Sequence, residues 1–589
     1  MADSRVAKHG DSKRPVIRPV IHFTAQSWIN DPCGPGYDPI TGLYHLFYQW
    51  NPDGCDWGNM SWGHIQSRDM ISWEEASMQP ALFPFRPYDK EGIFTGCLVP
   101  AGSGIEMTIF YSSVKHLPFH WSTPPYPRNA AGLSMATSHD GGATWQKSEN
   151  NPILEGEPAE MSVTGFRDPF VSAWPALDRL RGEQALYGLI SGGVTGAGPT
   201  TFLYAVEPER LGKWKYLGPL VDIPARKQSS EKWSGNFGTN WECVNFVTLQ
   251  SDSVSRDFLI IGAEGDVERK HILDGTLPPG LPARTIRQNL WMSGYLDTTV
   301  DAVKFHPTFD GFLDHGCYYA ANSFVDSRSG RRILYGWIPE EDCSLDYAHE
   351  KGWNGSLAVP REIFLLKIDR VTRALRSPLH EISSMSFVED HSESLTLITL
   401  GIRPFSEMSS IRENCRQARV FPQFSLPSLE HQSRHLCRTS HSAWSLQTVV
   451  AVSTDCGSVA LYIRHNEDLS IRTTIIVSLM EETITVERTA SSLREDVNKC
   501  HEQGPFTLFE AVDHHGERHW EKLHLDIVSD GDVLEIFANN RFALATMVYS
   551  GDGVANCGIT ACATGLHGSA SFESTRIFDG LNGMKPLFS

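Results

Sequence analysis

Apolar and polar residues alternate over short stretches in the first two thirds of the chain, where a helical period of apolar positions hardly appears. Tyr44–Trp50 is one such stretch, and Arg332–Trp337 is another, reached through turn residues at 326–330. Gly, Pro, Asn and Asp stand between these stretches. Short strands separated by such turns are typical of an all-β sandwich, barrel or propeller.

A weak internal repeat favours the propeller. Ser67–Trp73 is echoed by Ser138–Trp145, and each segment places a polar turn between a strand ending in Ser and a strand carrying Trp. The second copy resembles the Asp-box hairpin of propeller glycosidases. We interpret its Asp and Gly as turn-forming residues and its Trp as packing between blades, so the repeat indicates architecture rather than chemistry.

The pattern changes near Arg361. Residues 362–382 contain more Leu, Ile and Arg and fewer Gly, which is typical of closing strands and a connector. Further on, Thr483–Arg488 alternates like a half-buried strand, and Leu523–Ile527 is expected to turn into Val533–Phe537 as a hairpin. We expect an N-terminal extension (1–21), a catalytic propeller (22–370), a linker (371–385) and a C-terminal β-sandwich (386–589). The sandwich would support the propeller or, alternatively, bind sugar as a lectin does.

Length, charge and cysteine spacing narrow the class of protein. The 589 residues exceed the usual size of one domain, and 41% hydrophobic with 21% charged residues describe a folded soluble protein. A formal charge of −19 without a long Lys/Arg run argues against nucleic acid or a membrane as partner. Residues 1–19 lack the apolar core of a secretory signal, so we expect a cytoplasmic protein. The 12 Cys show neither zinc-ligand spacing nor a disulfide framework.

Three carboxylates stand among aromatic, Gly and Pro residues: Asp31, Asp168 and Glu242. Glycoside cleavage requires one carboxylic acid that protonates the leaving oxygen and a second carboxylate that attacks or activates water. Burial beside Trp241 is expected to keep Glu242 protonated near neutral pH, whereas Asp31 is expected to be ionised. Arg167 should keep Asp168 charged. Taken alone, Asp31 reads as a turn residue, and Arg167–Asp168 reads as a structural ion pair as readily as a functional one.

Further motifs stand in order with these carboxylates. They are Gln49–Pro52, Trp57–His64, Phe94–Cys97, and Gly352–Gly355 with Arg361. Together, the motifs resemble those of glycoside hydrolase family 32, the β-fructofuranosidases, which include invertases, inulinases and fructosyltransferases. The similarity runs from about residue 22 to residue 361 and is weaker around 534–537. The resemblance implies a five-bladed β-propeller followed by a β-sandwich.

Carried over by position, the resemblance implies that Asp31 is the nucleophile, Glu242 the general acid/base and Asp168 the stabiliser of the transition state. The sugar pocket that it implies comprises Asn30, Gln49, Trp57, Phe94, Thr95, Arg167, Cys243 and Trp353. Glu264 and His271 are candidates for the leaving-group site, with a surface loop as the alternative for both. Configuration would be retained through a covalent fructosyl-enzyme, without a metal or an organic cofactor. Expected partners are sucrose, short fructo-oligosaccharides and a second copy of the chain in a homodimer.

Some positions depart from the family pattern. Cys33 stands where many members have Asn, and Thr95 and Cys97 replace two Ser residues. The Cys33 form resembles fungal transferring or intracellular members, which leaves a dedicated fructosyltransferase or an inulinase as alternatives. Two further classes are a non-catalytic fructan-binding protein and an enzyme acting on arabinan or xylan. The presence of all three carboxylates argues against the first, and the Trp57–Met60 run with Glu242–Cys243 argues against the second.

Overall fold

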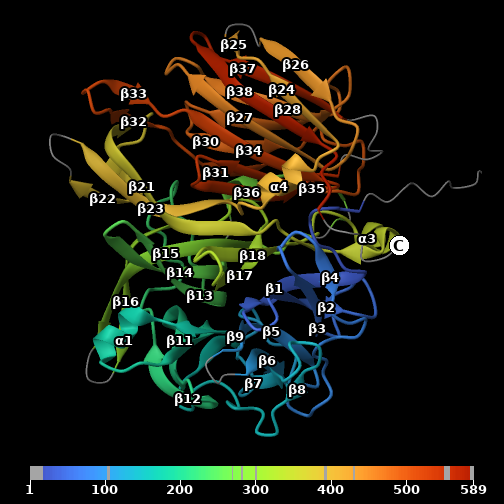
Figure 1. Cartoon of the computed structure of the whole chain (residues 1–589), viewed down its shortest axis with the longest axis vertical. Helices are drawn as coiled ribbons and strands as arrows, with labels where there is room; N and C mark the ends of the chain where they lie inside the picture. Colours follow the sequence, from blue (N-terminus) through green and yellow to red (C-terminus); the bar gives the residue numbers. More distant parts are fainter. Residues whose placement is uncertain are drawn as a thin grey trace, which may run out of the picture.

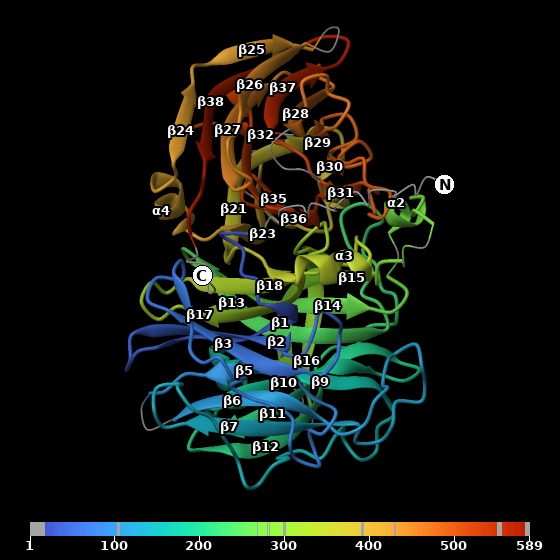
Figure 2. The same ribbon diagram turned by 90° about the vertical axis from the view of Figure 1, so that its right-hand side faces the viewer.

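The computed structural model describes residues 18–102, 106–267, 269–279, 281, 283–298, 302–389, 394–428, 432–549 and 557–583. It is all-β and consists of a five-bladed propeller followed by a β-sandwich, which confirms the expected fold class. Figure 1 and Figure 2 show the propeller sheets, blue to yellow-green, below the orange and red sandwich. No helix among the described residues is long and apolar enough to cross a membrane.

The first two blades carry the repeated hairpin. Blade one is formed by β1 (Ser27–Asp38), β2 (Leu43–Asn51), β3 (Ser61–Ser67) and β4 (Trp73–Glu75), with β19 (Trp353–Asn354) parallel to β1. Blade two is formed by β5 (Gly92–Val99), β6 (Met107–Val114), β7 (Ala131–Ser138) and β8 (Gln146–Lys147). The two repeat copies join the third strand to the fourth in each blade. In both, the indole N–H donates to the carbonyl three residues earlier, Trp73 to Met70 and Trp145 to Gly142.

The remaining blades follow in chain order. Blade three is β9 (Val163–Ala173), β10 (Leu186–Val194), β11 (Gly198–Glu207) and β12 (Arg210–Pro219), with α1 (Pro175–Arg181) after β9. Blade four is β13 (Asn240–Ser251), β14 (Val254–Glu264), β15 (Arg287–Thr298) and β16 (Val303–Phe312), with α2 (Lys270–Leu273) after β14. Blade five contains β17 (Tyr319–Val325), β18 (Arg332–Ile338), β20 (Ser356–Leu357) and β21 (Arg361–Ala374), with α3 (Leu345–Lys351) after β18.

The sheet of blade five continues towards the sandwich. β23 (Leu395–Pro404) pairs with β21, β22 (Ser386–Glu389) pairs with β23, and β32 (Phe509–Val512) and β33 (Arg518–Trp520) join at the far end of β21. The short helices η1 (Leu379–Glu381) and α4 (Met408–Glu413) flank this extension. The first strands after residue 386 therefore pair with the propeller rather than with the sandwich.

Two antiparallel sheets form the sandwich. One contains β24 (Gln417–Phe421), β38 (Ser569–Asp579), β27 (Trp444–Val452), β34 (Leu523–Asp530), β35 (Val533–Ala538) and β36 (Phe542–Met547), with β25 (Phe424–Pro427) beside β38. The other contains β26 (Ser433–Arg438), β37 (Gly558–Thr564), β28 (Ser458–His465), β29 (Thr473–Ser478), β30 (Thr483–Glu487) and β31 (Glu502–Pro505). The expected hairpin is confirmed, because β34 and β35 pair through Asp530 and Val533.

The innermost strands of the five blades close the propeller. β1, β5, β9, β13 and β17 contact one another in a ring, each strand touching the next and β17 touching β1. In every one of them the pairing with the second strand is interrupted by a register shift, at Asn30–Asp31, Thr95, Asp168–Pro169, Cys243–Val244 and Ala320–Ala321. Such bulges redirect side chains away from the regular alternation of a strand.

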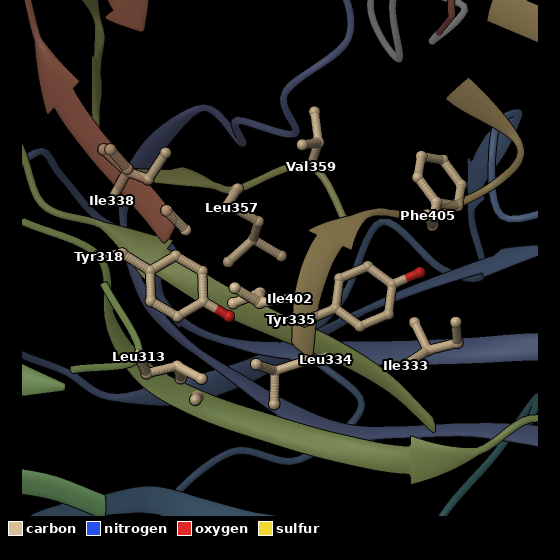
Figure 3. Close-up of a cluster of buried hydrophobic side chains, with 14 of the residues drawn as sticks. Leu313, Tyr318, Ile333, Leu334, Tyr335, Ile338, Leu357, Val359, Ile402 and Phe405 are labelled. Carbon is tan, nitrogen blue, oxygen red and sulfur yellow. The ribbon is translucent and has the colours of Figure 1, made fainter. Parts of the chain in front are cut away.

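Buried side chains join the propeller to the sandwich. Figure 3 shows part of this core, where Ile333, Leu334 and Tyr335 of β18 lie near Ile402 and Phe405 at the end of β23. The same cluster includes Val528 and other residues of the sandwich. Because apolar area is removed from water on both sides, this contact holds the two units together.

A fully buried ionic network crosses the same junction. Arg361 of β21 pairs with Asp314 at 2.8 Å and with Glu535 of β35 at 2.7 Å. The other oxygen of Glu535 lies 2.9 Å from His22, whose second ring nitrogen faces Asp530 at 3.0 Å. Burial opposes the imidazolium, but hydrogen bonds to the two carboxylates raise the pKa of His22 to about 9. The network therefore connects the start of the propeller with the β34–β35 hairpin.

Candidate active site

A cavity of about 470 Å³ opens where the five innermost strands present their bulges. Its walls include residues from all five strands, from the β2 segment and from several loops. They are Trp28, Asn30, Asp31, Gln49, Trp57, Phe94, Leu117, Pro118, Phe119, His120, Arg167, Asp168, Glu242, Glu264, Thr285, Arg287, Tyr319, Trp337 and Glu341. The three carboxylates singled out from the sequence share this cavity.

The local backbone explains how they come to do so. Asp31 and Asp168 are themselves bulge residues, and Glu242 directly precedes the bulge in β13. Asp168 has φ of 61° and Cys243 has φ of 49°, a left-handed conformation that is uncommon for residues other than glycine. Strain of this kind persists only where surrounding contacts hold it in place. The bulges thus turn side chains from neighbouring blades towards one point.

Asp31 is surrounded by neutral hydrogen-bond donors. Its Oδ2 accepts from the Thr95 hydroxyl at 2.5 Å and from the Gln49 amide at 3.4 Å, and its Oδ1 accepts from the Asn30 amide at 3.2 Å. The Cys243 thiol lies 3.5 Å from the same Oδ2 and 3.6 Å from Oδ2 of Asp168. These donors fix the orientation of the carboxyl group of Asp31 within the cavity.

Arg167 reaches past Asp168 to other carboxylates. Its Nη2 lies 2.7 Å from Glu242 and 2.7 Å from Glu264, whereas its Nε is 3.9 Å from Asp168. The second oxygen of Glu242 accepts from the Tyr319 hydroxyl at 2.7 Å. Glu242 is therefore held by two strong donors, and Asp168 accepts mainly the backbone N–H of Cys243 at 3.2 Å.

This arrangement reverses two protonation states expected from the sequence. Burial raises the pKa of Asp168 more than Arg167 lowers it, and the pKa reaches about 8. Burial would also raise the pKa of Glu242, but the charge of Arg167 and the bond from Tyr319 lower it below the usual value. Burial raises the pKa of Asp31 as well. The order of the two pKa values expected from the sequence is thus reversed, with the pKa of Asp168 raised and that of Glu242 lowered.

The expectation was wrong for a physical reason. The positive charge closest to Glu242 does not come from its neighbours in sequence. The guanidinium of Arg167 instead comes from β9 and points across the blade boundary to Glu242 of β13. A charge-assisted bond at this distance in a buried site outweighs the apolar neighbours along the strand.

Most of the other predicted pocket residues are brought together. Asn30, Gln49, Trp57, Phe94, Arg167 and Glu264 line the cavity. Thr95 and Cys243 lie directly behind the wall, in contact with Asp31. Trp57 is the exposed edge of the site, with 52% of its surface accessible and its ring edge-on to Phe94.

Two predicted residues are not in the wall, and both predictions are corrected here. Trp353 is fully buried in β19, where the ammonium group of Lys351 lies 3.9 Å from the ring centroid, so it supports β1 from behind. His271 lies on α2, and its Nε2 is 3.9 Å from Glu502 of the sandwich. The loop after β14 turns this histidine towards the sandwich and away from the cavity lining.

Several wall residues were missed by the sequence analysis. Trp28 was adjacent to the Asp31 motif, and its indole N–H donates to Asn30 at 3.1 Å, so its proximity was a usable signal. Tyr319 and Trp337 come from the two strands of blade five that pair at this position. Arg287 and Glu341 carried no local signal, because each stands in ordinary loop or strand sequence. In the described part of the chain no group of three His, Cys, Asp or Glu is arranged to hold a metal ion.

A propeller with a carboxylate-lined cavity at the centre of its blades, joined to a β-sandwich, defines a class of glycoside hydrolases. Family models match in the same order: the glycosyl hydrolases family 32 N-terminal domain over residues 22–376 and the family 32 C-terminal domain over residues 407–579. The chain belongs to glycosyl hydrolases family 32 and is a glycoside hydrolase.

Curated relatives and solved structures agree with this assignment. An insoluble β-fructofuranosidase, isoenzyme 1 of Oryza sativa subsp. japonica, is 30% identical over 381 residues, covering 63% of this chain and 57% of the rice protein. A fructan 1-exohydrolase of Hordeum vulgare is 28% identical over 427 residues, covering 70% of this chain and 62% of the barley protein. The chain thus aligns with somewhat more than half the length of these relatives.

Two fungal structures match over nearly the whole chain. The β-fructofuranosidase of Aspergillus kawachii, complexed with glycerol, superposes with a TM-score of 0.84 and 28% identity over 97% of this chain and 95% of that one. The fructosyltransferase of A. japonicus superposes with a TM-score of 0.85 and 25% identity over 98% and 97% of the two chains.

The raised pKa of Asp168 generates a prediction about stability. A carboxyl whose pKa lies at 3.8 when unfolded and at about 8 when folded destabilises the folded state progressively as pH rises between those values. Asp168→Asn removes this penalty and fits the left-handed backbone, which Asn tolerates. We expect the variant to unfold at a higher temperature than the wild type at pH 8, with a free energy of unfolding larger by at most about 5 kcal/mol, and at nearly the same temperature near pH 4.

The measurement is a series of thermal unfolding curves between pH 4 and pH 8. Asp140→Asn, in the exposed hairpin of blade two, is the control, because hydrogen bonds from Thr144 lower the pKa of Asp140 to about 2. That variant should show an offset from wild type that does not change over the same pH range. A gap for Asp168→Asn that stays constant with pH would contradict a raised pKa.

Proposed function

We propose that the chain is a retaining β-fructofuranosidase. It cleaves the fructosyl bond of sucrose and short fructo-oligosaccharides through a covalent fructosyl-enzyme and transfers fructosyl groups to sugars when sucrose is concentrated. The observation that carries the proposal is the convergence of Asp31, Asp168 and Glu242 on one cavity in a chain of this family. The names of the rice and A. kawachii relatives support the substrate class.

Asp31 is the proposed nucleophile. Its neutral donors, Thr95, Gln49 and Asn30, orient one carboxyl group without forming an ion pair. A carboxylate held in this way attacks the anomeric carbon and forms the covalent intermediate, and a second displacement from the same side restores the configuration. Asp168, beside it across the Cys243 thiol, would bind fructosyl hydroxyls and stabilise positive charge in the transition state.

Glu242 is the proposed acid/base, and it needs a proton before the first step. The carboxyl groups of the cavity interact strongly, so the protons that they keep belong to the set rather than to one residue. Substrate excludes water and brings hydroxyl groups that compete for Arg167, which raises the pKa of Glu242 towards the value required of an acid. The proton retained near Asp168 in the free cavity supplies this group.

Whether water or a sugar accepts the fructosyl group depends on contacts outside the fructosyl position. Trp57 is half-exposed at the rim, where it offers a face to a second sugar ring. A held acceptor hydroxyl competes with water because positioning offsets the higher concentration of water. The similarity to the A. japonicus fructosyltransferase supports the transfer part of the proposal. A dedicated fructosyltransferase or an inulinase on this fold is the second candidate.

The first test is a substrate panel. Incubation of the wild type with sucrose, inulin and an aryl arabinoside should release glucose and fructose rapidly from sucrose, fructose more slowly from inulin, and no sugar from the arabinoside. Separation of the products by chromatography gives the rates. Faster cleavage of inulin would favour the inulinase, and activity on the arabinoside alone would refute the proposal.

A second test varies the sucrose concentration. At low sucrose, free glucose and free fructose should appear in equal amounts because water accepts the fructosyl group. In concentrated sucrose the ratio of glucose to free fructose should exceed one, and short fructo-oligosaccharides should accumulate. A ratio that stays at one throughout would show that this enzyme only hydrolyses.

A third test concerns Glu242. Glu242→Gln should slow turnover of sucrose by about a thousandfold, because the leaving glucose lacks its proton donor. An aryl fructoside needs no proton and should still form the intermediate, and azide should accelerate its release as a fructosyl azide. Glu264→Gln is the matched control, since Glu264 shares Arg167 at the same distance. It should lower activity without rescue by azide, and rescue of both variants would argue against Glu242 as the acid/base.

A further inference from the structure

Two propeller segments build one side of the cavity and pair with each other. Arg287, at the start of β15, donates from Nη2 to Oε1 of Glu341 at 2.8 Å. The backbone N–H of Thr285 donates to the other oxygen of Glu341 at 3.2 Å. All three residues line the cavity. We call these three residues, Thr285, Arg287 and Glu341, the outer wall.

The outer wall lies on the side of the cavity that holds Glu242. The guanidinium of Arg287 lies 5.2 Å from the ring centroid of Tyr319 and 5.0 Å from that of Trp337. The Tyr319 hydroxyl in turn donates to Glu242, the proposed acid that protonates the leaving oxygen. A sugar attached to that oxygen therefore extends towards the outer wall.

The neighbouring residues of the same segments form a second pair that faces the opposite way. Arg284 donates from Nε to Asp342 at 3.0 Å and from Nη2 to the other oxygen of Asp342. Both side chains are nearly fully buried, with 9% and 2% of their surfaces accessible. Residues 284 and 342 are thus close in sequence to the wall residues 287 and 341, but they point into the junction with the sandwich.

Two sandwich residues complete this second pair. Arg488 donates to Asp342 at 2.8 Å, and Glu502 accepts from Nη1 of Arg284 at 2.6 Å. Arg488 also donates to the carbonyls of Cys500 and Met547, so it is fixed to the sandwich backbone. Two guanidinium groups and two carboxylates balance each other, and the positive charge of Arg284 keeps the pKa of Glu502 low despite burial.

Backbone contacts tie the same loop to the sandwich. The N–H of Asn498 donates to the carbonyl of Asp342 at 2.7 Å, and its side-chain amide donates to Oδ1 of Asp342 at 2.9 Å. Cys343 forms an isolated β-bridge with Val497. The position of Glu341 is therefore set by a loop whose next two residues are held by the sandwich.

We propose that Arg488 and Glu502 of the sandwich are positioning residues for the leaving-group side of the active site, acting through Arg284 and Asp342 on the outer wall. The inference rests on the proposed function, since it takes the substrate to be a fructoside whose second sugar reaches this wall. It gives the sandwich a role in substrate affinity, although no described residue of the sandwich lines the cavity.

Two variants weaken the contacts between the sandwich and the Arg284–Asp342 pair. Glu502→Gln leaves one positive charge in excess, whereas Arg488→Met with Glu502→Gln removes one charge of each sign, an exchange that buried ion pairs often tolerate. Both should raise KM for sucrose at least fivefold while kcat changes less than twofold. Inhibition by fructose alone, which occupies only the inner part of the cavity, should be unchanged.

The matched control lies in the other buried network of the same junction. Glu535→Gln weakens the contacts with Arg361 and His22, which do not line the cavity, and it should leave KM for sucrose within twofold of wild type. Equal rises of KM in Glu535→Gln and in the two variants at Glu502 would mean that the junction is loosened in general, and they would overturn the inference. An unchanged KM in the folded double variant would overturn it as well.

A double-mutant cycle separates this inference from the proposed function. If the wild type does not cleave sucrose, the proposed function fails, and the inference that rests on it fails as well. If it does, Glu341→Gln should raise KM for sucrose about tenfold, and adding Glu502→Gln should change it little further, because both act on one wall. Fold-changes that multiply would show that Glu502 acts independently of the outer wall and would refute the inference.

Discussion

Interrupted pairing in the five innermost strands is the constraint on which the site depends. A regular strand would send alternate side chains to opposite faces, and each bulge breaks that alternation. The freed backbone donors are taken up by the preceding blade. Asp168 N–H donates to the Ser112 hydroxyl at 2.7 Å, and Val244 N–H to the Ser191 hydroxyl at 2.9 Å. The bulges of blades three and four are thus each stabilised by the preceding blade.

The electrostatics of the cavity follow from this packing. Asp168 and Glu264 are buried, and Asp31 and Glu242 are half-buried. These four carboxyl groups, together with Glu341, face only Arg167 and Arg287 among the Lys and Arg residues of the wall, so full ionisation would leave an excess of negative charge. Protons must therefore be retained, and geometry decides where. The pKa of Asp168 is raised to about 8 and that of Glu264 to about 7, so these two carboxyl groups retain protons more readily than Glu242, whose pKa is lowered.

The junction between propeller and sandwich contains two buried ionic networks rather than an apolar contact alone. One joins His22 and Arg361 to Glu535, and the other joins Arg284 and Asp342 to the sandwich. Buried ion pairs contribute little net stability compared with apolar packing, but they define a unique geometry when every partner is satisfied. The second network lies directly behind the outer wall, so the geometry that it defines is carried into the cavity.

The sequence by itself determined the all-β class, because short alternating strands and turn residues leave no other regular structure, and the ordered motifs around Asp31, Asp168 and Glu242 indicated the family. It also located Asn30, Gln49, Trp57 and Phe94, since these stand within or beside motifs. Tertiary structure alone decided the charge states, because Arg167 crosses from one blade to the next to reach Glu242. It likewise excluded Trp353 and His271 from the wall and placed Arg287 and Glu341 there. The position of Glu341 depends on a loop that the sandwich holds, and contacts between segments distant in sequence leave no local pattern.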